Sequence, residues 1–137
     1  MSAEQPLKVL VYSDDRNTRE QIRLALGRSV ADDLPALKIV DTATAPATIR
    51  AVDATHFDAL IFDGEATPVG GMGLCYQLKD EVANCPPIMV LIARRDDSWL
   101  GTWSKADALT AHPVDPVTFP RLFADMVRKH REAVANA

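Results

Sequence analysis

The segment FDALIFD, from Phe57 to Asp63, places a short apolar run directly before an aspartate. A continuous apolar run that stops abruptly at a polar residue is typical of a strand buried on both faces, as in a parallel sheet. We therefore expect Asp63 at the carboxyl end of a strand, where open α/β sheets gather their functional groups. The alternative for Asp63 is a capping aspartate at a strand-to-loop junction.

Four other apolar runs predict four more strands, at Val9–Tyr12, Leu37–Val40, Ile88–Ala93 and Ala108–Ala111. Segments of helical periodicity separate them, at Asn17–Arg28, at Ala47–Ala54, around Leu74, Leu78 and Val82, at Ser98–Lys105 and, most clearly, at Phe119–His130. Strict alternation of strands and helices implies a parallel sheet with helices on both faces. The predicted fold class is α/β: a flavodoxin-like, doubly wound sheet of five parallel strands with five helices.

The composition is that of an ordinary globular domain, with 137 residues, 47% hydrophobic and 25% charged. Because no linker, repeat or low-complexity tract interrupts the chain, we expect residues 1–137 to form a single domain with no output domain. The net charge of −4 does not favour nucleic acid. No apolar stretch approaches the length of a membrane span, so no membrane insertion is expected. Cys75 and Cys85 are expected as reduced thiols in a cytoplasmic protein.

The residues that follow the predicted strands are mostly polar. Ser13, Asp14 and Asp15 follow the first strand, Asp63 the third, and His112 and Pro113 the fifth. Carboxylates gathered at one sheet edge repel one another, so a cation or raised pKa values would relieve them. Oxygen ligands with an open coordination sphere suit Mg²⁺, so Asp14, Asp15 and Asp63 form a candidate site for weakly bound Mg²⁺.

This pattern resembles the CheY-like receiver domains of two-component response regulators, from Lys8 to about His130. The resemblance implies that Asp63 is the aspartate that accepts a phosphoryl group from a histidine kinase. It implies that an acidic pair after the first strand helps to hold Mg²⁺. Pro113 matches the proline after the fifth strand, whose preceding peptide is commonly cis in the family.

The departures from the family pattern affect the residues that respond to phosphorylation. Ala93 replaces a threonine or serine, His112 replaces a lysine, and Leu109 replaces the switch aromatic. When positions are counted from Arg19 without gaps, Ser13 and Asp14 match the acidic pair of the family. A shift by one residue matches Asp14 and Asp15 instead. We prefer the first register, in which the resemblance implies that Asp14 is the direct metal ligand. The chain thus resembles a degenerate, stand-alone receiver.

Two of these residues have competing interpretations. His112 is either protonated by nearby carboxylates, as a weak substitute for lysine, or a neutral histidine hydrogen-bonded in a loop. Asp15 is either part of the acidic pair or the N-cap of the first helix.

Trp99 and Trp103 are four residues apart, so they share one face of the fourth predicted helix. They either cover the sheet or, if exposed, form an anchor for a protein partner, because tryptophan is enriched at interface hot spots. In the receiver family, partners dock on the face made by the fourth helix, the fifth strand and the fifth helix.

Our first functional hypothesis is an interaction module that binds a protein partner, or a larger assembly, without depending on phosphate. The second is a single-domain response regulator that relays phosphate from a histidine kinase through Asp63. An enzyme is not expected, since no Ser-His-Asp or Cys-His arrangement is present and carboxylates after the first strand would repel the phosphate of a flavin.

Overall fold

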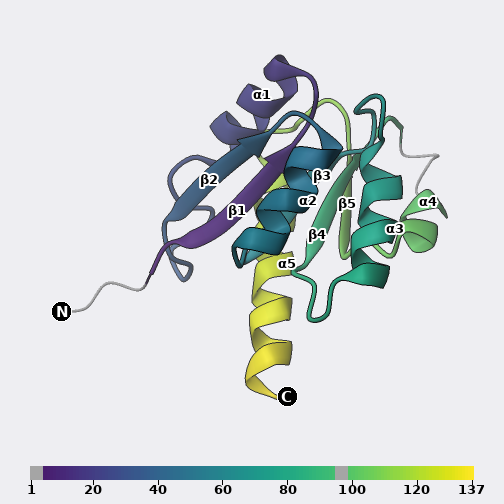
Figure 1. Ribbon diagram of the computed structural model, residues 1–137. Coiled ribbons are helices and arrows are strands. Elements are labelled where there is room, and N and C mark those ends of the chain that lie inside the picture. Colours follow the sequence, from purple (N-terminus) through teal and green to yellow (C-terminus); the bar gives the residue numbers. More distant parts are fainter. Residues whose placement is uncertain (1–4, 95–98) are drawn as a thin grey trace.

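The computed structural model describes residues 5–94 and 99–137. Strands and helices alternate strictly along the chain (Figure 1). The strands are β1 (Leu7–Tyr12), β2 (Leu37–Thr42), β3 (Ala59–Asp63), β4 (Ile88–Ile92) and β5 (Ala108–Ala111). The helices are α1 (Arg16–Leu26), α2 (Ala45–Ala54), α3 (Gly71–Glu81), α4 (Trp99–Ser104) and α5 (Thr118–Ala135).

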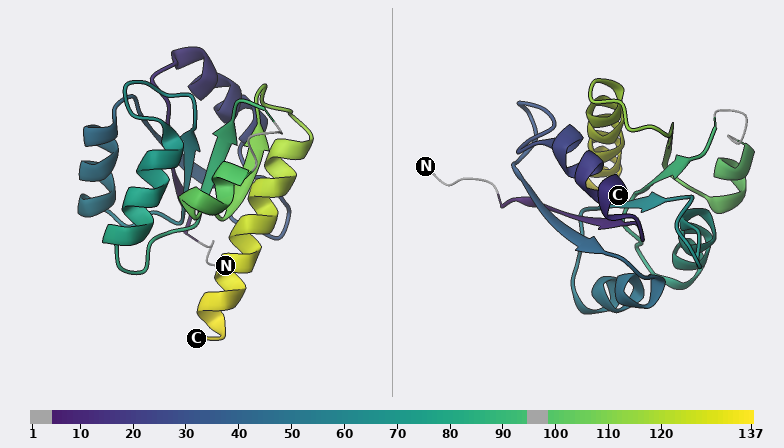
Figure 2. Two further views of the ribbon diagram at one scale, coloured as in Figure 1. Left: turned by 90° about the vertical axis from the view of Figure 1, so that its right-hand side faces the viewer. Right: turned by 90° about the horizontal axis from the view of Figure 1, so that it is seen from above.

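The strands form one parallel sheet in the order β2-β1-β3-β4-β5. Helices α1 and α5 cover one face, and α2 and α3 cover the other (Figure 2). The order reverses at β1, so the adjacent carboxyl ends of β1 and β3 lie at the topological switch point, where ligands bind in open α/β sheets. The predicted doubly wound, five-stranded sheet with five helices is confirmed.

The apolar runs are continuous because each inner strand contributes to two cores. Val9 and Val11 pack under α1 and α5, whereas Leu10 and Tyr12 pack under α2 and α3. All residues of β3 and β4 are buried. Burial on both faces removes the polar alternation that a half-exposed strand would show.

The N-terminal ends of two helices follow from capping residues. Asp15 caps α1 by accepting a hydrogen bond from the Asn17 amide, so α1 begins one residue earlier than predicted. Thr44 caps α2 through the Ala47 amide at 3.2 Å. The second helix therefore begins at Ala45 and not at Ala47, and the proline that follows fits the first turn.

Helix α4 is short and packs beside α3, not over the sheet. The Trp103 ring stacks on Tyr76 of α3 with ring centroids 4.9 Å apart. Trp99 is 67% exposed and Trp103 is 53% exposed, so the alternative in which they cover the sheet is wrong. The predicted start at Ser98 lies outside the described residues.

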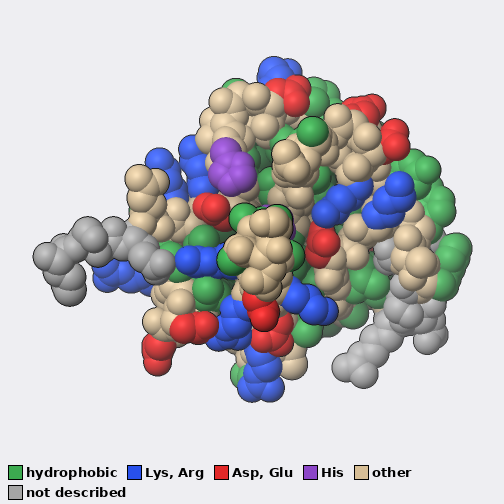
Figure 3. Space-filling model, turned by 90° about the horizontal axis from the view of Figure 1, so that it is seen from below, with side chains coloured by type: hydrophobic (Ala, Val, Ile, Leu, Met, Phe, Trp, Pro, Cys, Tyr) green, Lys and Arg blue, Asp and Glu red, His purple; other side chains and the backbone are tan. Residues whose placement is uncertain are grey.

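The molecule seen from the amino-terminal ends of the strands has Lys and Arg side chains interspersed with Asp and Glu (Figure 3). Neither sign of charge dominates this face. Within the described residues, no helix combines the length and the apolar character needed to cross a membrane.

Candidate functional site at the carboxyl ends of the strands

The carboxyl ends of β1, β3, β4 and β5 surround a cleft of about 470 Å³. Its lining consists of Asp14, Asp15, Thr18, Asp63, Glu65, Ala93 and His112. The predicted site residues Asp14, Asp15, Asp63, Ala93 and His112 are thus brought to one place, as expected for parallel strands that end at the same edge.

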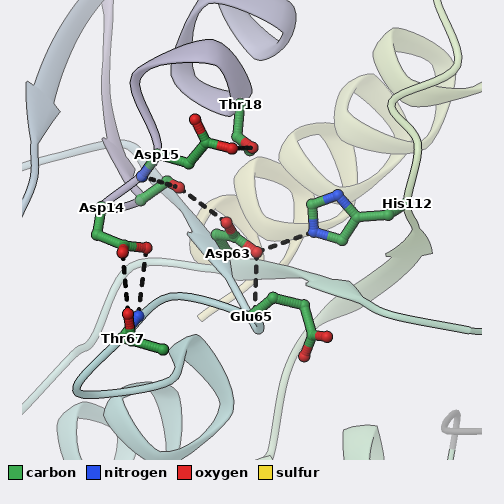
Figure 4. Close-up of polar contacts among 8 residues, drawn as sticks. Asp14, Asp15, Thr18, Asp63, Glu65, Thr67 and His112 are labelled. Atoms are coloured by element: carbon green, nitrogen blue, oxygen red, sulfur yellow. Dashed lines mark hydrogen bonds and ion pairs between the residues drawn. The ribbon is translucent and has the colours of Figure 1, made fainter.

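Asp63 is 3% exposed, and three donors from three different segments surround its carboxylate (Figure 4). The Ser13 hydroxyl donates to Oδ2 at 2.8 Å. The Glu65 amide and the His112 Nε2 atom both contact Oδ1 at 2.9 Å. Burial raises the pKa of Asp63, but these hydrogen bonds outweigh burial and the pKa is lowered overall. Asp63 is therefore an ionised side chain inside the protein.

His112 is the imidazole partner of Asp63. The hydrogen bond to Asp63 raises the pKa of His112 more than burial lowers it, and the charges of Asp63, Glu65 and Asp15 raise it further. Of the two interpretations of His112, this arrangement supports the protonated lysine substitute. The His112–Pro113 peptide is cis, as the family resemblance implied.

Asp14 turns toward the loop that follows β3 and not toward Asp63 (Figure 4). One carboxylate oxygen accepts from the Thr67 amide at 3.2 Å, and the other accepts from the Thr67 hydroxyl at 3.0 Å. Both oxygens of this exposed carboxylate are therefore held by a single loop residue.

Asp15 belongs to the start of α1. Its oxygens accept from the Asn17 amide at 2.9 Å and from the Thr18 hydroxyl at 3.1 Å. Ser13, and not Asp15, contacts Asp63. These contacts favour the register in which Ser13 and Asp14 overlie the acidic pair of the family.

The geometry does not fit the predicted Mg²⁺ site of Asp14, Asp15 and Asp63. Each carboxylate already has protein donors, and the three carboxylates are directed to three different segments. Across residues 5–94 and 99–137, no group of three or more His, Cys, Asp or Glu side chains is arranged to hold a metal ion. The physical reason is that hydrogen-bond donors of the chain stabilise the negative charges that a cation was expected to compensate.

The predicted replacements at the switch positions lie where the sequence placed them. Ala93 follows β4 and lines the cleft with a methyl group, which offers no hydrogen bond. Leu109 lies in β5 and packs against the core beneath α3. Leu109, His112 and Pro113 also line a groove of about 1000 Å³ along β5 and the first turn of α5.

Three residues of this site were missed by the sequence analysis: Thr18, Glu65 and Thr67. Thr18 lies three residues after the N-cap Asp15, a spacing that could have indicated the contact. Glu65 lies two residues after Asp63 in a turn, where an aspartate commonly accepts from the backbone amide. Nothing in the sequence indicates the contact of Thr67 with Asp14, because 53 positions separate the two residues.

An exposed aromatic cluster, formed by Tyr76, Trp99 and Trp103, lies on α3 and α4. The Lys105 ammonium lies 5.2 Å from the centre of the Tyr76 ring. The sequence predicted the exposed tryptophans as an anchor but placed them on the α4-β5-α5 face. The stacking on Tyr76 puts Trp103 on the α3 side of α4.

No protein-family model matches the chain. Two proteins from strains of Mycobacterium tuberculosis, each named an uncharacterized response regulatory protein, are 52% identical to it over 122 residues, or 89% of this chain and 92% of theirs. A chemotaxis response regulator of Vibrio cholerae has a similar structure, with a TM-score of 0.74, 17% identity and coverage of 89% of this chain and 99% of that one.

A second solved structure is the response regulator TrrA of Thermotoga maritima in complex with Mg²⁺-BeF. Its TM-score is 0.70 at 18% identity, with 87% of this chain and 97% of that chain covered. At this identity the two structures share the fold, and the ligand belongs to TrrA.

Proposed function

This chain belongs to the response regulators of two-component systems, and we propose that its CheY-like receiver domain works as a protein-interaction module that does not depend on phosphorylation. The observation that carries the proposal is the state of Asp63. Ser13, Glu65 and His112 already supply the hydrogen bonds that the buried carboxylate needs. Asp63 thus has the surroundings of a structural ion pair.

The surroundings of Asp63 also lack groups that phosphoryl transfer requires. Developing charge on a transferring phosphoryl group is stabilised by cations and hydrogen-bond donors placed in advance. Ala93 offers no donor, and Asp14 is held by Thr67. A histidine titrates near neutral pH and is a weaker cation than a lysine. Each difference lowers the expected rate of transfer to Asp63.

Two exposed surfaces support the interaction role. The aromatic cluster of Tyr76, Trp99 and Trp103 offers large apolar side chains of the kind found at interface hot spots. The groove along β5 and α5 lies on the face where receiver-family partners dock, and it includes Leu109, Pro113 and Leu122. We propose a protein partner, or a larger protein assembly, on these surfaces.

The second candidate function is a phosphate relay from a histidine kinase through Asp63. Its support is the ionised Asp63 carboxylate, which lines an open cleft at the strand ends. Mg²⁺ would be a cofactor of this function, and it would have to draw Asp14 away from Thr67.

A comparison of variants in cells separates the two functions. Proteins crosslinked to the chain would be quantified for the wild type, for Asp63→Asn and for the double variant Trp99→Ser, Trp103→Ser. If the chain is an interaction module, wild type and Asp63→Asn should be crosslinked to the same partners in the same amounts. The tryptophan double variant should lose these partners. Loss or exchange of partners in Asp63→Asn, with folding verified by circular dichroism, would instead favour the relay.

A further inference from the structure

In the loop between β3 and α3, residues 64–70, three residues are tied to the strand ends by four side-chain hydrogen bonds. The Glu65 amide donates to Asp63 at 2.9 Å. Thr67 donates to Asp14 through its amide and its hydroxyl. The buried Tyr12 hydroxyl donates to the Val69 carbonyl at 2.6 Å. The contacts run from one end of the loop to the other, so the whole loop is held against β1 and β3.

Glycines fix the path of this loop at both of its ends. A Cβ atom on Gly64 would lie 2.5 Å from the Leu91 carbonyl oxygen. A Cβ atom on Gly71 would lie 2.6 Å from the Asp63 carbonyl oxygen. The backbone approaches the sheet more closely than any side chain permits, so glycine is required at both positions. The position of Thr67 over Asp14 is thus set by the packing of the loop on the sheet.

Thr67 takes up both oxygens of Asp14, the carboxylate that the preferred register assigns as the direct metal ligand. The amide and the hydroxyl each contact a different oxygen, and the carboxylate faces the loop (Figure 4). A cation at the strand ends would need Asp14 to turn toward Asp63 and to give up both donors. Hydrogen bonds to an ionised group are stronger than those between neutral groups, so this rearrangement has a cost.

We propose that Thr67 is a positioning residue that holds Asp14 on the β3–α3 loop and thereby weakens the binding of divalent cations at the strand ends. The inference concerns the site of the proposed function and rests on it, since a held Asp14 is one reason to expect independence from phosphate. It names the residue that weakens metal binding: through Thr67, the loop competes with the metal ion for the Asp14 carboxylate.

The test is a Mg²⁺ titration followed by ¹H–¹⁵N NMR on the full chain, with no phosphoryl donor present. Thr67→Val removes the hydroxyl donor and keeps the shape of the side chain. It would be compared with the wild type, and both would be repeated in a Ser13→Asp background that supplies a second carboxylate. We expect Thr67→Val to lower the apparent dissociation constant for Mg²⁺ by about fivefold, the scale of one typical hydrogen bond.

Two controls separate positioning from a general effect on folding. Thr67→Ser retains the hydroxyl and should keep the affinity of the wild type. Thr102→Val changes an exposed threonine of α4 and should also leave the affinity unchanged. Unfolding temperatures would verify that all variants are folded.

The proposal is overturned if Thr67→Val and wild type bind Mg²⁺ equally in both backgrounds, or if none of the four proteins binds it. Neither result depends on phosphorylation or on a partner. A failure of this inference is therefore distinguishable from a failure of the proposed function, which is tested by partner binding in the Asp63→Asn variant.

Discussion

Asp63 and His112 form an ion pair between the ends of β3 and β5, with Oδ1 and Nε2 2.9 Å apart. Asp63 is almost fully buried, whereas His112 keeps partial contact with water. A buried carboxylate needs a cation or several donors, and here it has three hydrogen-bond partners. The contact with Asp63 also raises the pKa of His112 and so favours its protonated form.

The first prediction concerns the protonation of His112. In an NMR titration of the histidine ring signals, His112 should have a pKa above the ordinary value of about 6.5. In Asp63→Asn the pKa of His112 should fall, because burial remains while the hydrogen bond to a carboxylate and its charge are lost. His56 and His130 line a cleft at the other end of the strands and serve as internal controls. An unchanged His112 titration in Asp63→Asn would rule out the ion pair.

The second prediction concerns stability and pH. The raised pKa of His112 means that its stabilising effect is complete below the unfolded value of about 6.5 and is lost as the pH rises through the folded pKa. The lowered pKa of Asp63 means that its stabilising effect on the folded state is present above the unfolded pKa of about 3.8. The effect is lost as the pH falls through the pKa of the folded state. Urea unfolding should therefore give a larger difference between wild type and His112→Gln at about pH 5.5 than at about pH 8.5. A difference that is constant with pH would contradict this assignment.

At the scale of elements, the sequence predicted all five strands and their order along the chain, because each buried strand is a continuous apolar run bounded by polar residues. Helix ends were less predictable. Helix α2 begins at Ala45 because the Thr44 side chain caps it, which periodicity alone does not reveal. The fourth helix was correctly placed but packs beside α3, and a pattern of four-residue spacing cannot say which neighbour a helix face meets.

The third prediction tests the start of α3. Gly71→Ala should destabilise the protein by about 1–3 kcal/mol, because its Cβ would meet the backbone of Asp63, which cannot move aside. Gly73 lies in the same helix, and a Cβ atom added there would have no neighbour within 4 Å, so Gly73→Ala is the matched control. It should be neutral or stabilising by up to about 1 kcal/mol. Equal effects of the two substitutions in urea unfolding would contradict the close packing of the loop.

At the scale of the whole molecule, the fold brings functional groups from four strand ends together, and sequence reasoning located most of them. Asp63, Ala93 and His112 were predictable because each follows a recognisable strand. The contact of Asp14 with Thr67 was not, because it depends on how the β3–α3 loop folds back over β1. The three carboxylates line one cleft but, among the described residues, are not arranged to hold a metal ion, for the same reason. The strand ends determine where each backbone segment lies, but not which donors each side chain contacts.

The whole molecule therefore combines a complete receiver fold with a buried Asp63 carboxylate that already has protein hydrogen-bond partners. Its exposed features lie elsewhere, in the aromatic cluster on α3 and α4 and in the groove along β5 and α5. This distribution is the basis for proposing a role in protein binding that does not require phosphate.

The most direct test of this account is the intact mass of the purified protein after incubation with acetyl phosphate and Mg²⁺, with Asp63→Asn treated in parallel. We predict that the folded wild type and the variant both keep their unmodified mass, because Asp63 is held by Ser13 and His112 and Asp14 is held by Thr67. A phosphoryl adduct on the wild type that is absent from Asp63→Asn would contradict the account and favour the phosphate relay.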